Sequence, residues 1–312
     1  MNRAEFLLAA AAAPLVLRRP PASLAFVTAD TESRVTVVDL ERGVVRSHIA
    51  TRPGPRSIER VGETAVVAHS VLGELTLIDT RTLGIRHELT GLGEPRYTAG
   101  TAGGRLAFVT DSGHRDLVTV DVLRGRIVGR LALTQWPRHL SLSPDGRTLW
   151  VGLGTSSNAV AVVDVSDPLR PTLRGHLRPP FPMHDVGIAP GGRRAWVTAG
   201  GSASVAVFDV RSGRVLATLP SDRGPQHVAF AAGRAFVTSG AAGTLRVYDE
   251  PSLEPRGSTE LPEGSYNVQF AGRGVLSPSL DAGTLCVVDG RGRRTLRVHV
   301  AASSHDACLA RP

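Results

Sequence analysis

The chain has 312 residues, and its 34 glycines and 21 prolines together make up roughly one residue in six, which predicts many short elements. Hydrophobic residues at 42% and charged residues at 21% are enough for a packed core and exclude a disordered or collagen-like chain. The formal net charge is +8, but all 36 basic residues are arginines scattered along the chain. Without a basic tract, and with only 4% aromatic residues, a nucleic-acid-binding protein is disfavoured.

Residues 1–22 differ in composition from everything that follows. The apolar run from Phe6 to Leu17 is too short to span a bilayer but matches the hydrophobic region of a secretory signal. The opening Asn-Arg-Ala-Glu-Phe-Leu resembles a twin-arginine signal with one arginine missing, while Arg18 and Arg19 oppose translocation. We expect a signal-like segment at 1–22, a folded domain at 23–312, no transmembrane span and a secreted or cell-envelope protein. The alternative is a cytoplasmic protein with a short N-terminal helix.

An apolar run that ends in aspartate recurs seven times along the rest of the chain. The aspartates are separated by 40 to 45 residues and are Asp39, Asp79, Asp121, Asp164, Asp209, Asp249 and Asp289. A glycine usually follows four or five residues later, as at Gly43, Gly84, Gly125 and Gly213. Aspartate at a strand end caps backbone N–H groups and glycine takes the positive φ of a reversal, so this pattern predicts hairpin turns.

Three further strands accompany each of these runs. The copies Leu24–Thr28, Leu106–Thr110 and Ala235–Thr238 come before the aspartate strand, and strands such as Val44–Ile49 follow it. The first strand of each unit opens with polar residues, as at Arg138-His139. Four short strands in 40 to 45 residues form one propeller blade, so seven units predict an all-β, seven-bladed β-propeller. Because the chain starts with a second strand and ends with a lone first strand, we expect the C-terminal strand to join the N-terminal blade and close the ring.

The repeat also resembles a known family. Its elements Pro-x-x-Val-Ala-x-Ser-Pro-Asp-Gly, a Val-Thr strand and Val-x-Val-Val-Asp are similar to the YVTN-repeat β-propellers, the surface-layer and YncE-like family, over residues 24–309. Ser143-Pro144-Asp145-Gly146 is the best match to the family turn, whereas other blades keep only glycine there. The resemblance implies the propeller fold and a binding or scaffold role. It does not imply a particular ligand, because one fold carries many functions.

Loops that enter the innermost strands of a propeller gather at one end of its central channel. The residue pairs at these openings are Arg56-Ser57, Arg96-Tyr97, Arg138-His139, His184-Asp185, Gln226-His227, Tyr266-Asn267 and His305-Asp306. Guanidinium forks match planar oxyanions, so Arg56, Arg96 and Arg138 are candidates for binding a small anion, with Tyr266 as a further contact.

Histidine and aspartate fill the remaining openings. Neutral imidazole and carboxylate are ligands for Zn, Mn, Fe or Cu, and the candidate metal ligands are His139, His184, His227, His305 and Asp306. If the site is catalytic, His184, His227 and Asp185 are the candidate acid–base groups. The sequence is compatible with one divalent metal ion or with none, because polar side chains are expected at the wet mouth of any propeller channel.

Two functions remain open from the sequence. The first is a monomeric binding or protein-interaction module that takes a small anionic ligand or a protein partner at the polar mouth of the channel. The alternative is a metal-assisted or histidine-based lyase or hydrolase acting on a small anionic substrate at the same mouth.

Overall fold

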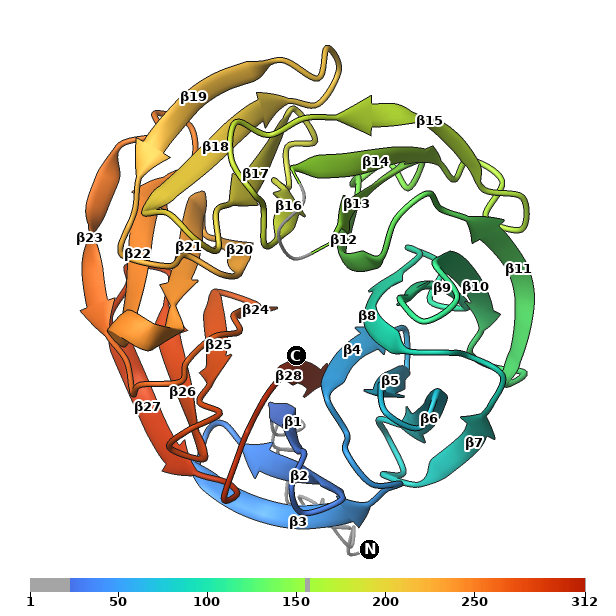
Figure 1. Cartoon of the computed structure of the whole chain (residues 1–312). Coiled ribbons are helices and arrows are strands. Elements are labelled where there is room, and N and C mark those ends of the chain that lie inside the picture. The colour runs from blue at the N-terminus through green and yellow to red at the C-terminus, as the bar shows by residue number, and fades with distance from the viewer. Residues whose placement is uncertain (1–22, 155–157, 312) are drawn as a thin grey trace, which may run out of the picture.

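The structure, a computed structural model, describes residues 23–154 and 158–311 and has the predicted seven-bladed architecture (Figure 1). These residues form 28 strands in seven four-stranded antiparallel sheets and one short 3-10 helix, η1 (Gly240–Ala242). None of them forms a helix long and apolar enough to cross a membrane. The predicted signal segment, residues 1–22, lies outside the described residues.

Each blade runs outward from the channel in four strands. The innermost strands are β4 (Ser57–Val61), β8 (Pro95–Gly100), β12 (Pro137–Leu142), β16 (Val186–Ile188), β20 (Val228–Ala231), β24 (Gln269–Ala271) and β28 (Ala307–Arg311). The second strands are β1 (Leu24–Ala29), β5 (Thr64–His69), β9 (Leu106–Asp111), β13 (Thr148–Leu153), β17 (Arg194–Thr198), β21 (Arg234–Ser239) and β25 (Gly274–Pro278).

The two outer layers complete the blades. The third strands are β2 (Arg34–Asp39), β6 (Glu74–Asp79), β10 (Asp116–Asp121), β14 (Ala159–Asp164), β18 (Ser204–Asp209), β22 (Thr244–Asp249) and β26 (Thr284–Asp289). The outermost strands are β3 (Val44–Ala50), β7 (Ile85–Leu89), β11 (Arg126–Ala132), β15 (Thr172–Leu177), β19 (Val215–Pro220), β23 (Pro255–Glu260) and β27 (Arg294–His299). Apolar side chains of the second and third strands are almost all buried, so the core lies between neighbouring blades.

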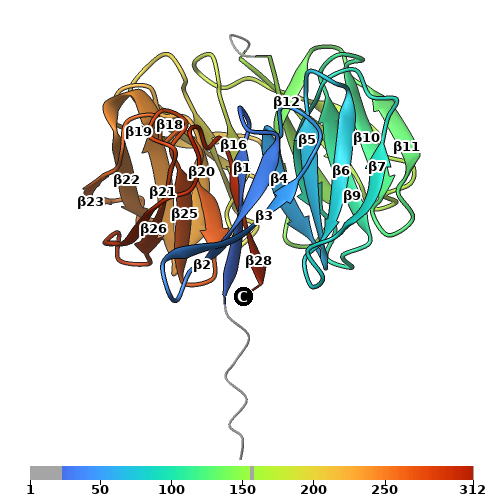
Figure 2. The ribbon, with the colours of Figure 1, turned by 90° about the horizontal axis from the view of Figure 1, so that it is seen from below.

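The ring closes as predicted. Strand β28 pairs antiparallel with β1, with Phe26 opposite Cys308 and Val27 opposite Ala307. The first blade therefore contains strands from both ends of the described chain, in the order β28-β1-β2-β3. The end of β28 and the start of β1 lie at the same end of the channel, opposite the loops that enter the innermost strands (Figure 2). Closure leaves no innermost strand without a partner, which removes the long edge that an open sheet would expose.

The repeated aspartates act as turn caps. Each of the seven accepts a hydrogen bond from a backbone N–H two or three residues later; Asp79, for example, accepts from Arg81 at 2.7 Å and Thr82 at 2.9 Å. Gly43, at φ +66°, shows the left-handed conformation that was expected of the following glycine. Gly84 does not adopt it, because the preceding Leu83 takes the positive φ of 63° instead.

A second repeated contact ties four of the blades to the next one. A threonine at the last or penultimate position of the second strand donates its hydroxyl to the carbonyl of the first residue at the next opening: Thr28 to Arg56, Thr110 to Arg138, Thr198 to Gln226 and Thr238 to Tyr266. The spacing between donor and acceptor is 28 residues in all four cases. The Val-Thr strands thus fix the height at which each opening enters the channel.

Candidate functional site

The second residue of each opening decides whether that opening binds the neighbouring blade or faces the channel. Four of the seven contact backbone groups of the next blade. Asp185 accepts from Val228 N–H at 3.1 Å, Asp306 accepts from Ile58 N–H at 3.0 Å, Asn267 donates to His305 C=O at 2.8 Å, and the Ser57 hydroxyl donates to Arg96 C=O. These side chains join the blades of the ring.

The other three second residues, Tyr97, His139 and His227, turn to one another across the channel. The ring centroids of Tyr97 and His139 are 4.1 Å apart, and those of His139 and His227 are 4.6 Å apart. His184, the first residue of its opening, joins them at 4.8 Å from His139 and 5.4 Å from His227. Aromatic rings from four different blades therefore form one layer across the channel.

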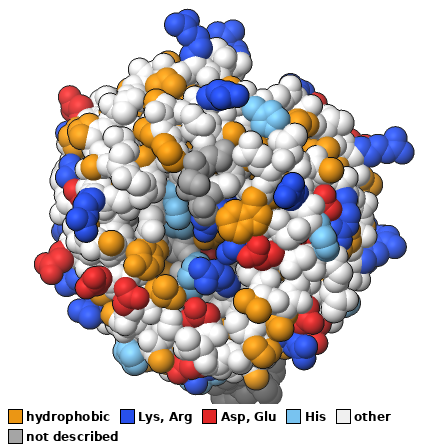
Figure 3. Space-filling view, viewed as in Figure 1, with side chains coloured by type: hydrophobic (Ala, Val, Ile, Leu, Met, Phe, Trp, Pro, Cys, Tyr) orange, Lys and Arg blue, Asp and Glu red, His pale blue; other side chains and the backbone are white. Residues whose placement is uncertain are grey.

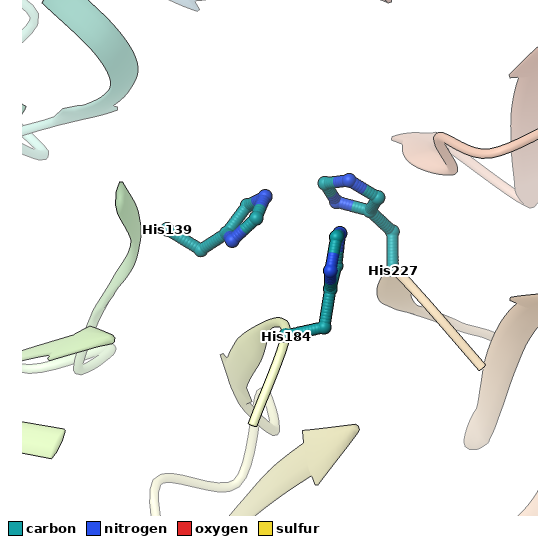
Figure 4. Close-up of side chains that lie close together, drawn as sticks. All are labelled: His139, His184 and His227. Carbon is teal, nitrogen blue, oxygen red and sulfur yellow. The ribbon is translucent and has the colours of Figure 1, made fainter. Parts of the chain in front are cut away.

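Three of these rings offer metal ligands at one point. One ring nitrogen each of His139, His184 and His227 lies within 4.8 Å of the other two, and the three imidazoles point toward one another (Figure 4). We call these three residues the histidine cluster. It contains three of the five predicted metal ligands.

His139 is the centre of the histidine cluster and, although the His184 backbone lies close to it, its ring nitrogens form no well-aligned hydrogen bond among the described residues. Its side chain is only 2% exposed, and neither Nδ1 nor Nε2 forms a hydrogen bond within the described part of the chain. Burial, together with the neighbouring imidazoles and Arg138, lowers the pKa of His139 and of His184 well below the ordinary histidine value. Both rings are therefore neutral near pH 7, with lone pairs available to a metal ion.

Asp185 orients the third imidazole. Its Oδ2 lies 3.4 Å from His227 Nδ1 and also accepts the Val228 N–H, while Oδ1 accepts the Val186 N–H at 2.7 Å. The carboxylate is thus held by two backbone donors and faces His227. A carboxylate next to one ring nitrogen leaves the other ring nitrogen free to bind a ligand, an arrangement common at metal-binding histidines.

The three predicted arginines lie at the mouth, in the first residue of each opening. The Arg96 and Arg138 guanidiniums stack on Trp136, at 4.9 Å and 5.7 Å from its ring centroid. Arg96 pairs with Glu94, and this glutamate also accepts the Trp136 indole N–H at 3.2 Å. Burial and the nearby charges of Arg138 and Arg56 lower the pKa of Arg96. Basic and histidine side chains are visible in the hollow at the centre of this face (Figure 3).

Positive charge at the mouth is only partly neutralised. Neither Arg56 nor Arg138 forms an ion pair with any residue in 23–154 or 158–311. By contrast, most of the other aspartates and glutamates of the ring are paired with arginines, such as Asp79 with Arg86 and Asp121 with Arg105. Some of the scattered arginines thus serve the turns, and the mouth keeps a small surplus of positive charge.

Two of the predicted metal ligands lie outside the histidine cluster. His305 Nδ1–H donates to Arg56 C=O at 2.9 Å, and burial lowers the His305 pKa to about 3. Asp306 is 1% exposed and accepts the N–H groups of Ile58 and Ala307, so both its oxygens serve the closure of the ring. Burial raises the Asp306 pKa to about 6.

Tyr266, the predicted ligand contact, packs against a neighbouring loop. A Cβ added at Gly240 would lie 2.1 Å from Tyr266 Cδ1, so only glycine allows this ring to lie on the loop that follows β21. Burial and the charges of Asp281 and Glu263 raise the Tyr266 pKa. None of the ring contacts of the histidine cluster involves Tyr266 among the described residues.

A cavity of about 370 Å³ lies in the channel beside Tyr97, His139 and His227. It is lined by second and later residues of the innermost strands, among them Glu59, which the sequence analysis did not single out. Burial and the charge of Asp306 raise the Glu59 pKa to about 8. Glu59 was missed because it is the fourth residue of its opening, two positions after Ser57. Tyr97 was missed because it was interpreted only as the neighbour of Arg96.

Comparisons with known proteins support the fold. No protein-family model and no curated protein matches the chain. Among solved structures, a functionally unknown protein from Desulfotomaculum acetoxidans has a TM-score of 0.81 at 12% identity, covering 93% of this chain and 99% of that one. Apo AztD from Citrobacter koseri has a TM-score of 0.71 at 14% identity, with coverages of 92% and 97%. The dihydro-heme d1 dehydrogenase NirN has a TM-score of 0.66 at 15% identity, covering 96% of this chain and 77% of that one.

These likenesses establish the seven-bladed propeller and nothing finer, because all three identities are below the level at which function carries over. The resemblance to YVTN-repeat propellers rests on the repeats alone.

Proposed function

We propose that this chain is a binding protein that holds one divalent transition-metal ion in the histidine cluster of its propeller channel. The observation that supports the proposal most strongly is the convergence of three imidazoles from three blades, with ligand nitrogens within 4.8 Å of one another. The buried His139 has no hydrogen-bond partner for either nitrogen, which is costly unless a ligand supplies one.

The donor set favours Zn²⁺. Three neutral histidines are a known zinc ligand set, and Zn–N distances of about 2.0–2.1 Å require ligand nitrogens roughly 3.3 Å apart in a tetrahedral site. The ligand nitrogens are now up to 4.8 Å apart, so the imidazoles must turn toward one another to bind the ion. Three protein ligands leave a fourth coordination position for water or for a bound molecule.

A small anion is the ligand that fits the mouth best. Arg56 and Arg138 are without ion pairs in the described part of the chain, and the positive charges of both reach Tyr97 and His305. A carboxylate or phosphate held by these guanidiniums would neutralise the surplus positive charge at the mouth. Residues 1–22 carry the apolar run of a signal, and we place the protein outside the cytoplasm on that ground.

An enzyme is the second candidate function. A zinc ion with three histidines and one open position is also the arrangement of catalytic sites, where the metal activates water or polarises an oxygen. Asp185 beside His227 favours this reading, because it can hold the imidazole in one tautomer. A metal-assisted lyase or hydrolase acting on a small anion would use the same residues.

Elemental analysis of the untagged protein, after zinc loading and desalting, tests the metal. We expect close to one zinc per chain, and an affinity loss of at least about 100-fold in His139→Ala and in His184→Ala. His299→Ala is the matched control, because His299 is exposed on the outer strand β27 and should leave the zinc content unchanged.

Wild-type protein that retains no zinc, or histidine-cluster variants that retain it fully, would refute the metal site. Turnover of small carboxylate or phosphate esters by the loaded protein, lost in His184→Ala, would favour the enzyme over the binding protein.

A further inference from the structure

The cavity below the aromatic layer belongs to a different part of the channel from the arginines. Its lining includes second, third, fourth and fifth residues of the openings, such as His139, Leu140 and Ser141, but none of the first residues. Innermost strands run from the mouth toward the opposite end, so the cavity extends away from Arg56, Arg96 and Arg138 (Figure 2). We call this space the lower chamber.

The lower chamber opens at the end of the channel opposite the mouth. Phe230, Phe270 and Pro190 line both the chamber and a second cavity of about 370 Å³ formed by the ends of these strands. Phe270 is 55% exposed, which is unusual for a phenylalanine, and it stands at this boundary. A ligand can therefore reach the lower chamber past Arg234 and Glu250, which line the second cavity, without passing Arg56, Arg96 and Arg138 at the mouth.

The chamber wall is about half apolar and half polar. The apolar side chains of this wall are Leu140, Val186, Ile188, Val228, Phe230, Val268 and Phe270. A volume of this size is in the range of a small-molecule site, and the mixed lining suits a molecule with an apolar and a polar part.

The charged groups of the chamber are carboxylates. Glu59 and Asp185 line it, and no arginine does. Asp185 is already occupied by two backbone N–H groups and His227. Glu59 receives one hydrogen bond, from the N–H of Arg60 at 3.1 Å, and no other within the described residues.

Nearby cations compensate Glu59 only weakly. Arg60 is the next residue on β4 and its charge acts to lower the Glu59 pKa, but successive side chains of a strand point to opposite faces and Arg60 is exposed. Burial and the negative charge of Asp306 outweigh it and raise the pKa of Glu59 to about 8. The Thr98 hydroxyl, also in the chamber wall, is buried without a hydrogen-bond partner.

We infer that the lower chamber binds a small organic cation, an amine whose ammonium group pairs with Glu59 and whose apolar part lies against Phe230 and Phe270. An ammonium group stabilises the ionised form of Glu59, which burial and Asp306 disfavour in the free chamber, and supplies donors to Glu59 and Thr98. An anion of the same shape finds no arginine among the described residues of the chamber wall. The inference does not require the metal, because its polar contacts are Glu59 and Thr98, although His139 and His227 of the histidine cluster also line the chamber.

Three probes of one shape separate the contributions of charge and apolar contact. Isothermal titration calorimetry of the full chain, dialysed against EDTA to prevent coordination of the amine to a metal, compares phenethylamine, 2-phenylethanol and phenylacetate. We expect phenethylamine to bind at least about tenfold more tightly than 2-phenylethanol, and phenylacetate to bind most weakly.

Variants identify the chamber as the site. Glu59→Gln should weaken phenethylamine binding about tenfold and leave 2-phenylethanol unchanged, whereas Glu63→Gln, an exposed glutamate in the turn after β4, should change neither. Phenylacetate is compared in the Arg56→Ala/Arg138→Ala double variant, which removes carboxylate binding at the mouth. An amine that binds no more tightly than the alcohol, a phenylacetate that binds more tightly than the alcohol in that double variant, no binding of any probe, or equal affinity in Glu59→Gln would each overturn the inference.

Discussion

The seven blades use one position of the channel in two ways. In four blades the second residue of the opening, Ser57, Asp185, Asn267 or Asp306, reaches a backbone group of the next blade. In the other three blades the same position holds Tyr97, His139 or His227, whose rings meet in the channel.

Within one repeat, this difference separates positions that stabilise the ring from positions that can bind a ligand. A side chain that satisfies a neighbouring N–H or C=O has its polar groups occupied and adds to the stability of the ring. A buried imidazole without a partner adds little stability and keeps its donor and acceptor atoms for a ligand. The candidate site is therefore found where blades depart from the inter-blade contact, and substitutions at the two kinds of position should have opposite effects on stability and binding.

The largest effect is expected from Asp306→Ala. It leaves the N–H groups of Ile58 and Ala307 buried and unpaired at the ring closure, so the free energy of unfolding should fall by about 2–4 kcal/mol. His139→Ala should change it by no more than about 1 kcal/mol, because no protein partner loses a hydrogen bond. Urea denaturation followed by circular dichroism measures both.

Equal losses of stability in Asp306→Ala and His139→Ala would contradict the division of the opening position into two roles. Asp185→Ala is an informative third variant, because it removes two backbone contacts like Asp306→Ala and also frees His227. It should lose both stability and zinc affinity.

A smaller effect is expected from Thr198→Val. The Thr198 hydroxyl donates to Gln226 C=O and accepts the Asp185 N–H at 3.0 Å, so valine of the same shape leaves both backbone groups without it. The free energy of unfolding should fall by about 1–2 kcal/mol, with weaker zinc binding because the His184-Asp185 opening loosens.

The equivalent substitution Thr28→Val provides the control for that experiment. Thr28 contacts Arg56 C=O and the Asp306 backbone, at an opening without a histidine of the cluster. Thr28→Val should lower the free energy of unfolding by a similar amount, as measured by denaturation. It should leave zinc affinity unchanged, as measured by competition with a chelator. Loss of zinc affinity in Thr28→Val would show that the whole ring, and not one opening, sets the site.

The smallest effect concerns the pH dependence of stability. The pKa of Glu59 is raised from 4.5 to about 8, so the folded state binds this proton more tightly than the unfolded chain does. The stabilisation is complete below about pH 4.5 and is lost as pH rises to about 8. Glu59→Gln, which stays neutral, should gain a few degrees in thermal midpoint relative to wild type between pH 5 and pH 8.5.

Thermal midpoints of wild type and Glu59→Gln that stay parallel across this pH range would show that Glu59 is solvated like a surface carboxyl. Asp306, whose pKa of about 6 has the same sign of shift, is present in both proteins, and because its charge contributes to the Glu59 shift the comparison reports on the pair.

Much of the fold could be predicted from the sequence because its turn residues recur periodically. Asp39 and its six equivalents mark turns by local backbone capping, a property of one residue and its near neighbours. The phase of the repeat also predicted closure by β28, and both follow from short-range chemistry repeated seven times.

The candidate site could be predicted only in part, because it depends on distances between blades. The openings indicated His139, His184 and His227, but the same reasoning proposed His305 and Asp306, which contact the backbone of the neighbouring blade. Whether a side chain reaches the next blade depends on the distance between the two blades, and the periodicity of the sequence does not give this distance. Glu59 is followed by Arg60, and such a charged pair is typical of a solvent-exposed face of a strand. Only the position of β4 in the structure shows that Glu59 lines the channel.

The pairing of β28 with β1 orders events during synthesis. Strands β1, β2 and β3 leave the ribosome early, yet the inner edge of β1 stays without its partner until residues 307–311 have been made. Until then this edge can template pairing with another chain, which makes the unfinished ring a species that chaperones must shield. A circular permutant that joins the two ends and opens an exposed turn between other blades would let the first blade form at once, and it should refold with less aggregation.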